Sequence, residues 1–163
     1  MTTAAATEAM IHFYAGKKHD IAHFLKVYSY AKTIGELEKL DEKTQFTLEI
    51  AAIVHDIPCP LCREKYGSAD GKLQEKEGPA LAAAFLAPMG FGKELIERVS
   101  WLVGHHHTYT DVDGMDHQIL LEADFLVNAD EHNLPASAIE QMRDTVFRTA
   151  SGKRLLNSIY LQA

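Results

Sequence analysis

Two histidines and two aspartates stand at positions suited to metal or acid–base chemistry. His23 and His55 recur with aliphatic neighbours at the three- and four-residue spacing of a helical face, and Asp56 follows His55 directly. Asp124 lies inside the apolar stretch 119–127. A buried carboxylate without a partner is costly or becomes neutral by protonation. We therefore expect these four side chains to be paired.

Two kinds of pairing are open for these side chains. A divalent cation would satisfy all four at once, because imidazole and carboxylate ligands suit Zn, Fe, Mn and Co. Alternatively each has its own partner: the histidines bond to backbone carbonyls, Asp124 pairs with a Lys or Arg, and Asp56 occupies a helix-end turn. Taken one at a time, the residues favour separate partners, and only their combination favours the cation.

Three short stretches that contain these residues resemble a known family. HFLKV at 23–27, IVHD at 53–56 and EADFLVN at 122–128 are similar to the three ordered motifs, H, HD and D, of the HD-domain superfamily of metal-dependent phosphohydrolases. The likeness extends over about residues 19–130. It implies an all-α bundle with a divalent metal (Mn, Fe, Co, Zn or Mg) at its centre. The ligands that it implies are His23, His55, Asp56 and Asp124.

The resemblance also raises the possibility of a second metal ion. Two-metal members of the superfamily carry two further histidines, and here Glu77 and the triplet 105–107 fall at those places. A carboxylate can still bind iron or manganese. We therefore expect Glu77, with His105 and His106 as equal candidates, at a second metal. The alternative for the triplet is a cationic helix C-terminus, which is the favoured interpretation for His107.

Candidate substrate-binding residues follow the HD motif in the chain. The stretch from Tyr66 to Lys72 contains two glycines and is able to bring Lys72 and backbone N–H groups to a phosphate, although a solvated turn fits nearly as well. We expect Tyr66 and Lys72 at the substrate. Lys26 is added by the resemblance, because family members often carry a basic residue at this spacing after the first histidine.

The remaining thiols and histidines carry no clear motif. Cys59 and Cys62 have the spacing of a redox or zinc pair, but neither a second ligand pair nor a βαβ unit accompanies them, so we expect them to pack as small apolar side chains. The histidines without a partner motif, which we expect at the surface, are His12, His19, His117 and His132.

The implied activity is cleavage of a phosphomonoester or phosphodiester of a small molecule, with a nucleotide as one candidate. Asp56 would bind metal and orient the attacking water, while Lys72 and His105 would stabilise the phosphate or protonate the leaving group. Two other classes stay open. One is a di-iron oxygenase of the same fold, for which Glu77 and the histidine triplet would supply ligands, and the other is a non-catalytic sensor that binds metal or nucleotide.

Helices must position these residues. A chain of 163 residues with 47% hydrophobic residues has the size of one domain with a sizeable core. We expect a single all-α bundle over 1–163, with a motif-bearing core at about 19–130 and C-terminal helices at 135–162, and an irregular segment at 57–75 with one helical turn near 61–65. The periodicity predicts helices over 21 to about 40, 44–56, 77–86, 93 to about 106, 116 to about 131, 135–147 and 155–160.

The net charge of the chain restricts the classes of molecule that it is expected to bind. With 16 basic and 23 acidic residues the net charge is −7, which favours neither a nucleic acid polymer nor an anionic membrane surface. An anionic small-molecule substrate must then be attracted locally. The first residues lack the cationic and apolar regions of a secretory signal, so we expect a cytoplasmic protein. A homodimer is compatible with the sequence, which does not determine the oligomeric state.

Overall fold

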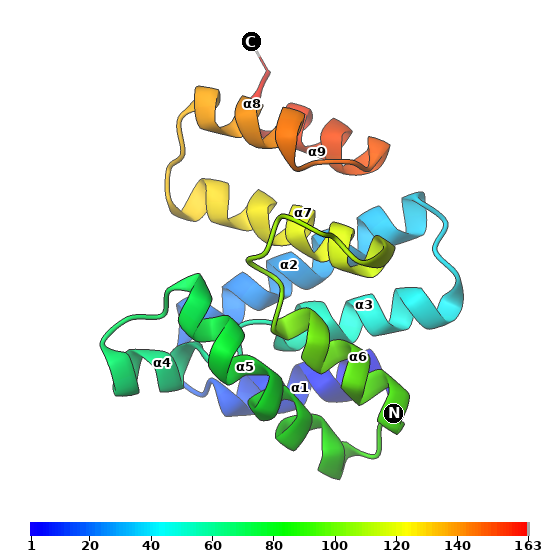
Figure 1. Cartoon of the computed structure of the whole chain (residues 1–163), viewed down its shortest axis with the longest axis vertical. Helices are drawn as coiled ribbons and strands as arrows, with labels where there is room; N and C mark the ends of the chain where they lie inside the picture. The colour runs from blue at the N-terminus through cyan, green and yellow to red at the C-terminus, as the bar shows by residue number, and fades with distance from the viewer. Residues whose placement is uncertain (163) are drawn as a thin grey trace.

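The computed structural model describes residues 1–162, and these contain nine α-helices, one 3₁₀ turn and no strand (Figure 1). The predicted all-α fold is confirmed. None of the helices in this range is both long and apolar enough to cross a membrane. The elements are α1 (Thr3–Phe13), α2 (Lys18–Leu37), α3 (Glu42–Val54), α4 (Cys59–Tyr66), α5 (Gly71–Leu86), η1 (Ala87–Met89), α6 (Lys93–Val103), α7 (Gly114–Glu131), α8 (Ala136–Thr145) and α9 (Ala150–Tyr160).

Three helices form the centre of the bundle. α2 packs against both α3 and α7, and α3 also contacts α6, which pairs with α5. α1 lies against α3, while α8 and α9 form a pair on the far side of α7 (Figure 1). The helices that bear the three sequence motifs are therefore neighbours in space, although they are far apart along the chain.

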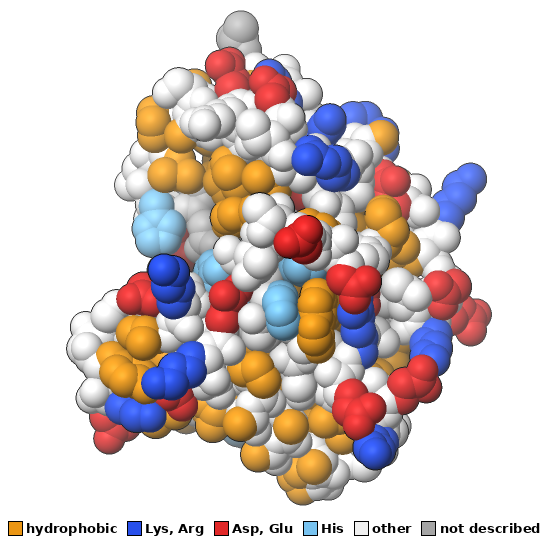
Figure 2. Space-filling view, viewed as in Figure 1, with side chains coloured by type: hydrophobic (Ala, Val, Ile, Leu, Met, Phe, Trp, Pro, Cys, Tyr) orange, Lys and Arg blue, Asp and Glu red, His pale blue; other side chains and the backbone are white. Residues whose placement is uncertain are grey.

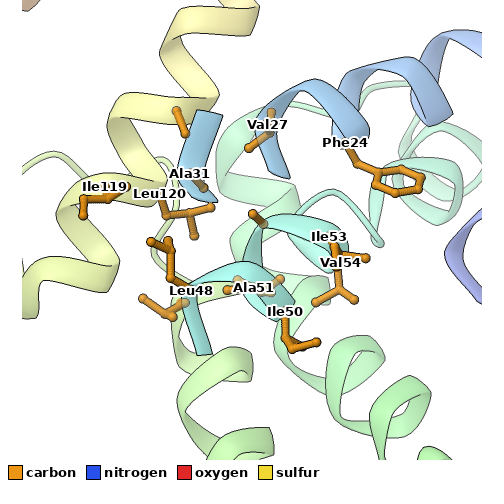
Figure 3. Packing of buried hydrophobic residues seen from close by; sticks show 14 of the residues in the cluster. Phe24, Val27, Ala31, Leu48, Ile50, Ala51, Ile53, Val54, Ile119 and Leu120 are labelled. Carbon is orange, nitrogen blue, oxygen red and sulfur yellow. The ribbon is translucent and has the colours of Figure 1, made fainter. Parts of the chain in front are cut away.

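The core lies where these central helices meet. α3 is buried continuously over Thr47–Val54, which is why its sequence is almost uniformly apolar there. Buried side chains of α2, α3 and α7 pack together there, among them Phe24 and Val27 of α2 and Ile119 and Leu120 of α7 (Figure 3). This packing fixes the relative positions of α2, α3 and α7. It therefore also fixes the positions of the few polar side chains that these helices place among the apolar ones.

The segment after α3 is more regular than predicted. Residues 57–75 were expected to be irregular, but α4 occupies Cys59–Tyr66 and α5 already begins at Gly71. Pro58 precedes α4, and a second proline lies in its first turn, where a missing N–H costs nothing. Gly67 ends α4 in the left-handed conformation with φ of +68°. Asp70 then caps α5 by accepting a hydrogen bond from the N–H of Leu73.

The first helix and the end of α6 also differ from the predictions. α1 was not predicted; it is short, capped by Thr2, and buries Ala6 and Met10. α6 ends at Val103 rather than near 106, and residues 104–107 form turns. The histidine triplet therefore leaves the helical geometry that was used to assign its faces.

Candidate metal centre

Four polar side chains from α2, the end of α3 and α7 meet in the middle of the bundle, and we call them the His/Asp cluster (His23, His55, Asp56, Asp124). The Nε2 atom of His23 lies 3.1 Å from Asp56 Oδ2 and 3.1 Å from Asp124 Oδ1. It is also 3.2 Å from the Nε2 atom of His55, which in turn lies 3.3 Å from Asp124 Oδ1. The structure thus brings together all four residues that the sequence motifs singled out.

The position of Asp56 is set by the turn that ends α3. The N–H of Ile57 donates to the carbonyl of Val54, and the N–H of Cys59 donates to the carbonyl of Asp56. The hydroxyl of Tyr14, a fully buried residue just after α1, also donates to the Asp56 carbonyl at 2.5 Å. The unpredicted first helix therefore has a role at the site, since Tyr14 fixes the backbone that presents Asp56.

The second ring nitrogen of each cluster histidine is already engaged. Nδ1 of His55 lies 2.7 Å from the carbonyl of Ala52, and Nδ1 of His23 lies 2.9 Å from Glu131 Oε2. A carbonyl only accepts, so Nδ1 of His55 carries a proton and Nε2 of the same ring faces the cluster. Such bonds to the outer nitrogen orient histidines that bind metals.

The donor set fits a cation. The carboxylates of Asp56 and Asp124 lie 3.5 and 3.3 Å from Nε2 of His55, and polar atoms held this way need a proton or a metal ion between them. Burial opposes the charging of His23, but hydrogen bonds with Asp124 and Asp56 outweigh it and raise the pKa of His23 to about 11. Burial likewise raises the pKa of Asp124, yet hydrogen bonds from His23 and His55 bring it below its ordinary value. The centre therefore stabilises positive charge.

A second set of ligand atoms adjoins the cluster on its α5–α6 side. The Nε2 atom of His106 lies 3.5 Å from Asp56 Oδ1, and both His106 and His107 place Nε2 3.0 Å from Oε1 of Gln74. Nδ1 of His106 is held by the carbonyl of Val103 at 2.7 Å. Single ligand atoms of Asp56, His106 and His107 lie within 4.8 Å of one another, close enough to bind one ion.

Two glycines allow α5 and α6 to approach closely enough for this arrangement. A Cβ atom on Gly78 would lie 2.6 Å from Val103 Cγ1, and one on Gly104 would lie 2.9 Å from Pro79 Cγ. Real Cβ contacts are longer than this, so neither position accepts a side chain without movement of the helices. The close contact brings α5 beside the turn that follows α6, and so places Gln74 next to the histidines.

The other predicted second-metal ligands lie outside this set. His105 stacks on Trp101 with ring centroids 3.9 Å apart, and its Nδ1 lies 2.7 Å from the Trp101 carbonyl. Glu77 accepts hydrogen bonds from Tyr66 at 2.5 Å and Lys65 at 2.9 Å, and the two donors lower the pKa of its carboxyl group. In the structure Gln74 and His107 therefore lie beside His106. The sequence had led us to expect Glu77 and His105 there.

Two hollows are lined by residues of the His/Asp cluster, and a third hollow adjoins one of them. The inner hollow, about 320 Å³, is lined by Asp56, Ala69, Gly71, Gln74, His107, Tyr109, Asp124, Phe125, Asn128, His132 and Leu134. The Arg63 hollow, about 230 Å³, is lined by His19, Asp20, His23, Asp56, Cys59, Arg63, Ala69, Gln74, Asn128, Glu131 and His132. The Lys72 hollow is lined by Asp70, Gly71, Lys72, Glu75, His107, Thr108, Tyr109 and Thr110.

The predicted substrate residues are distributed unevenly around these hollows. Lys72 is exposed in its hollow, which shares Gly71, His107 and Tyr109 with the inner hollow. Lys26 lies on a separate surface hollow with Asp130, and Tyr66 is engaged by Glu77, so neither lines the three hollows. A larger hollow of about 840 Å³ runs along α1 and contains no cluster residue, so size alone does not mark the site.

Several residues at the site were not singled out by the sequence. Beside the cluster, Arg63 forms a bidentate ion pair with Asp20, in which Nη2 lies 2.7 Å from Oδ1 and Nη1 lies 3.1 Å from Oδ2. Asn128 and His132 follow Asp124 at intervals of four along α7 and line both the inner and the Arg63 hollows. In the sequence, only this spacing could have indicated that they belong to the site, because it places Asp124, Asn128 and His132 on one helical face.

The two thiols and the remaining histidines differ in their burial. Cys59 and Cys62 are both buried as free thiols. His12, His19 and His132 are exposed, as predicted. The prediction for His117 was wrong: it is fully buried, and its Nε2 lies 2.9 Å from the carbonyl of His105, so it supports the turn that carries the triplet. Figure 2 shows histidine side chains reaching the surface in the middle of the molecule, between the C-terminal helices and the α4–α6 region.

Comparison with known proteins gives two matches. Residues 20–137 match the family model described as the HD domain. The fold is similar to the crystal structure of a predicted HD superfamily hydrolase from an uncultured Thermotogales bacterium, with a TM-score of 0.69 and 26% sequence identity. The alignment covers 97% of this chain and 84% of that chain. No curated protein matches the sequence. The range matched by the family model includes every residue of the His/Asp cluster.

Proposed function

The chain belongs to the HD domain family, and on that premise we propose that it is a metal-dependent phosphohydrolase that cleaves a phosphomonoester or phosphodiester of a small molecule. The family resemblance and the HD-type fold expected from the sequence are both confirmed. The observation that carries the proposal is the convergence of Nε2 and carboxylate atoms in the His/Asp cluster while the outer nitrogens are held. The similar structure, itself a predicted hydrolase, supports the reaction class.

Several residues of the chain have separate roles in the proposed reaction. A divalent ion bound at the cluster would polarise a phosphoryl oxygen and lower the pKa of a water molecule. Asp56 borders both ligand sets and is partly exposed to the hollows, so its carboxylate can orient that water. Burial, and then His106, lower the pKa of His107 to about 4, so this ring is neutral near pH 7 and can bond to a phosphate without carrying charge. Lys72 offers a positive charge in the adjoining hollow.

An iron-dependent oxygenase is a second candidate that one observation favours. Asp56, His106 and His107 form a set of two histidines and one carboxylate, which is a ligand type used by non-haem iron enzymes. Gln74 adds a neutral oxygen at 3.0 Å from both histidines, where a second carboxylate would bind iron more strongly. Iron content together with substrate-dependent consumption of O₂ distinguishes this candidate from the hydrolase.

The test combines elemental analysis with an activity screen. Protein purified without chelator is analysed for metal and then assayed for phosphate release with Mn, Co, Fe, Zn and Mg. We expect Asp56→Asn to lower phosphate release at least about a hundredfold, the order of magnitude contributed by a group that transfers or orients a proton. The matched control is Asp130→Asn, an exposed aspartate of α7 outside the three hollows around the cluster.

Each outcome decides a different part of the proposal. Full activity in the Asp56→Asn protein would refute the assigned mechanism. Metal and ligand binding without turnover in the wild-type protein would identify a sensor module instead of an enzyme. A protein that takes up no metal, and whose melting temperature is unchanged by added metal, would show that the cluster is only a buried polar network.

A further inference from the structure

The inner hollow has two walls of different chemistry. At its base are the carboxylates of Asp56 and Asp124, which belong to the His/Asp cluster. Phe125 and Leu134 also line the hollow and give it an apolar wall, and Phe125 is held in place by edge-on packing against Phe147. A hydrolysis site needs only the first wall for the phosphate. The second wall therefore points to a group of the substrate that is not phosphate.

Tyr109 stands at the rim of the same hollow. Its side chain lies on the stretch between α6 and α7, and the residue is 44% exposed, which is high for a large aromatic side chain. Within residues 1–162 its ring has no aromatic partner and its hydroxyl has no hydrogen-bond partner. Tyr109 lines the Lys72 hollow as well, so it stands where the two hollows join. An unpartnered aromatic ring at this rim is suited to contact with a ligand ring.

The Arg63 hollow on the other side of the cluster has no comparable surface. It is lined mainly by charged and titratable side chains, among them Asp20, Arg63, Glu131 and three histidines, and within the described residues no side chain of Phe, Tyr, Trp, Leu, Ile or Val contributes. Burying an apolar group there would remove water from charged atoms without compensation. An organic group attached to the phosphate would therefore enter the inner hollow rather than the Arg63 hollow.

We propose that the inner hollow binds the organic part of the substrate, a planar aromatic group attached to the phosphate, which packs against Tyr109 and the wall of Phe125 and Leu134. The inference rests on the proposed function, because the phosphate must be at the His/Asp cluster. A volume of about 320 Å³ is at the lower end of ligand pockets, so it fits a single ring system. Tyr109 determines specificity here and takes no part in the chemistry.

The test measures binding rather than turnover. Phenylphosphonate and methylphosphonate carry the same anionic group, are not hydrolysed at the P–C bond, and differ only in the ring. Their dissociation constants are measured by titration calorimetry with the Mn²⁺-loaded protein. We expect phenylphosphonate to bind about tenfold more tightly, and Tyr109→Ala to reduce that ratio to about twofold or less, because the variant loses the contact between the tyrosine ring and the phenyl ring.

Two further variants serve as controls for Tyr109→Ala. Tyr109→Phe keeps the ring and removes the hydroxyl, so it should retain the wild-type ratio. Met115→Ala removes a side chain of similar exposure, 41%, that lines none of the three hollows, and it should also retain the ratio. Because Tyr109 is half exposed, its replacement leaves the core intact.

The outcomes separate this inference from the proposed function. Equal dissociation constants for the two phosphonates, no binding of either, or an unchanged ratio in Tyr109→Ala would each overturn the inference. Failure to release phosphate from phenyl phosphate with any metal, together with a phenyl preference that disappears in Tyr109→Ala, would refute the hydrolase and leave the aromatic subsite standing.

Discussion

Replacement of Glu131 by Gln tests whether the His/Asp cluster is a metal site, without altering any of the four proposed ligands. Glu131 Oε2 lies 2.9 Å from Nδ1 of His23, and both side chains are largely buried, at 12% and 6% exposure. Among residues 1–162 the carboxylate is the only group bonded to that nitrogen, so it keeps the Nε2 lone pair directed at the cluster when a metal is bound. An amide of the same shape preserves the packing and removes the charge.

Groups that orient a metal-binding histidine typically contribute 10- to 100-fold to metal affinity. We therefore expect Glu131→Gln to raise the dissociation constant for Mn²⁺ or Zn²⁺ by about 10- to 100-fold, which corresponds to about 1.4–2.7 kcal/mol. Competition with a chromogenic chelator measures the constant. The control is Asp130→Asn, which removes one charge from the neighbouring position of α7. Equal metal affinity in Glu131→Gln and the wild-type protein would refute the reasoning.

Two further predictions concern packing and protonation. In Gly71→Ala the new Cβ would lie 2.9 Å from Cγ and 3.0 Å from Cβ of His107, atoms too close to the backbone to move freely, so we expect a loss of about 1–3 kcal/mol in denaturant unfolding and a weaker second metal site. An alanine variant as stable as the wild type would contradict this. The raised pKa of His23 makes a stabilising contribution to the metal-free protein that is complete below pH 6.5 and is lost as the pH rises toward about 11. Metal must displace that proton, so metal affinity should increase with pH up to about 11, and a dissociation constant independent of pH would exclude the assignment.

The residues at the centre of the site can be predicted from the sequence because they interrupt a regular pattern of apolar residues. His23, His55 and Asp124 are polar side chains on otherwise apolar helical faces, and helical periodicity shows this without knowledge of the fold. The helices α2, α3 and α7 were predicted for the same reason. The three helices come together through long-range packing, which periodicity does not reveal. The order of the family motifs in the sequence indicated that these helices meet.

The edge of the site is less predictable because it depends on turns and on contacts between helices. His105, His106 and His107 were assigned by extending α6, but the helix ends at Val103 and the turn rotates the three rings into different surroundings. Gln74 has no distinctive sequence signal. It reaches the histidines only because α5 begins earlier than expected and Gly78 permits close packing on α6.

The charge of the site argues that metal is needed for substrate binding as well as for catalysis. The protein carries a net charge of −7, and a phosphate that approaches the cluster meets Asp56 and Asp124, with Glu131 behind His23. Protons on His23 and His55, whose pKa values are both raised by Asp56 and Asp124, offset the carboxylates within the cluster, whereas a divalent ion offsets them and also binds the phosphate directly. The metal-free protein can therefore keep its core and its cluster while offering no metal ion to an anionic ligand, and the first effect of metal loss should be on the affinity for phosphonates rather than on the fold.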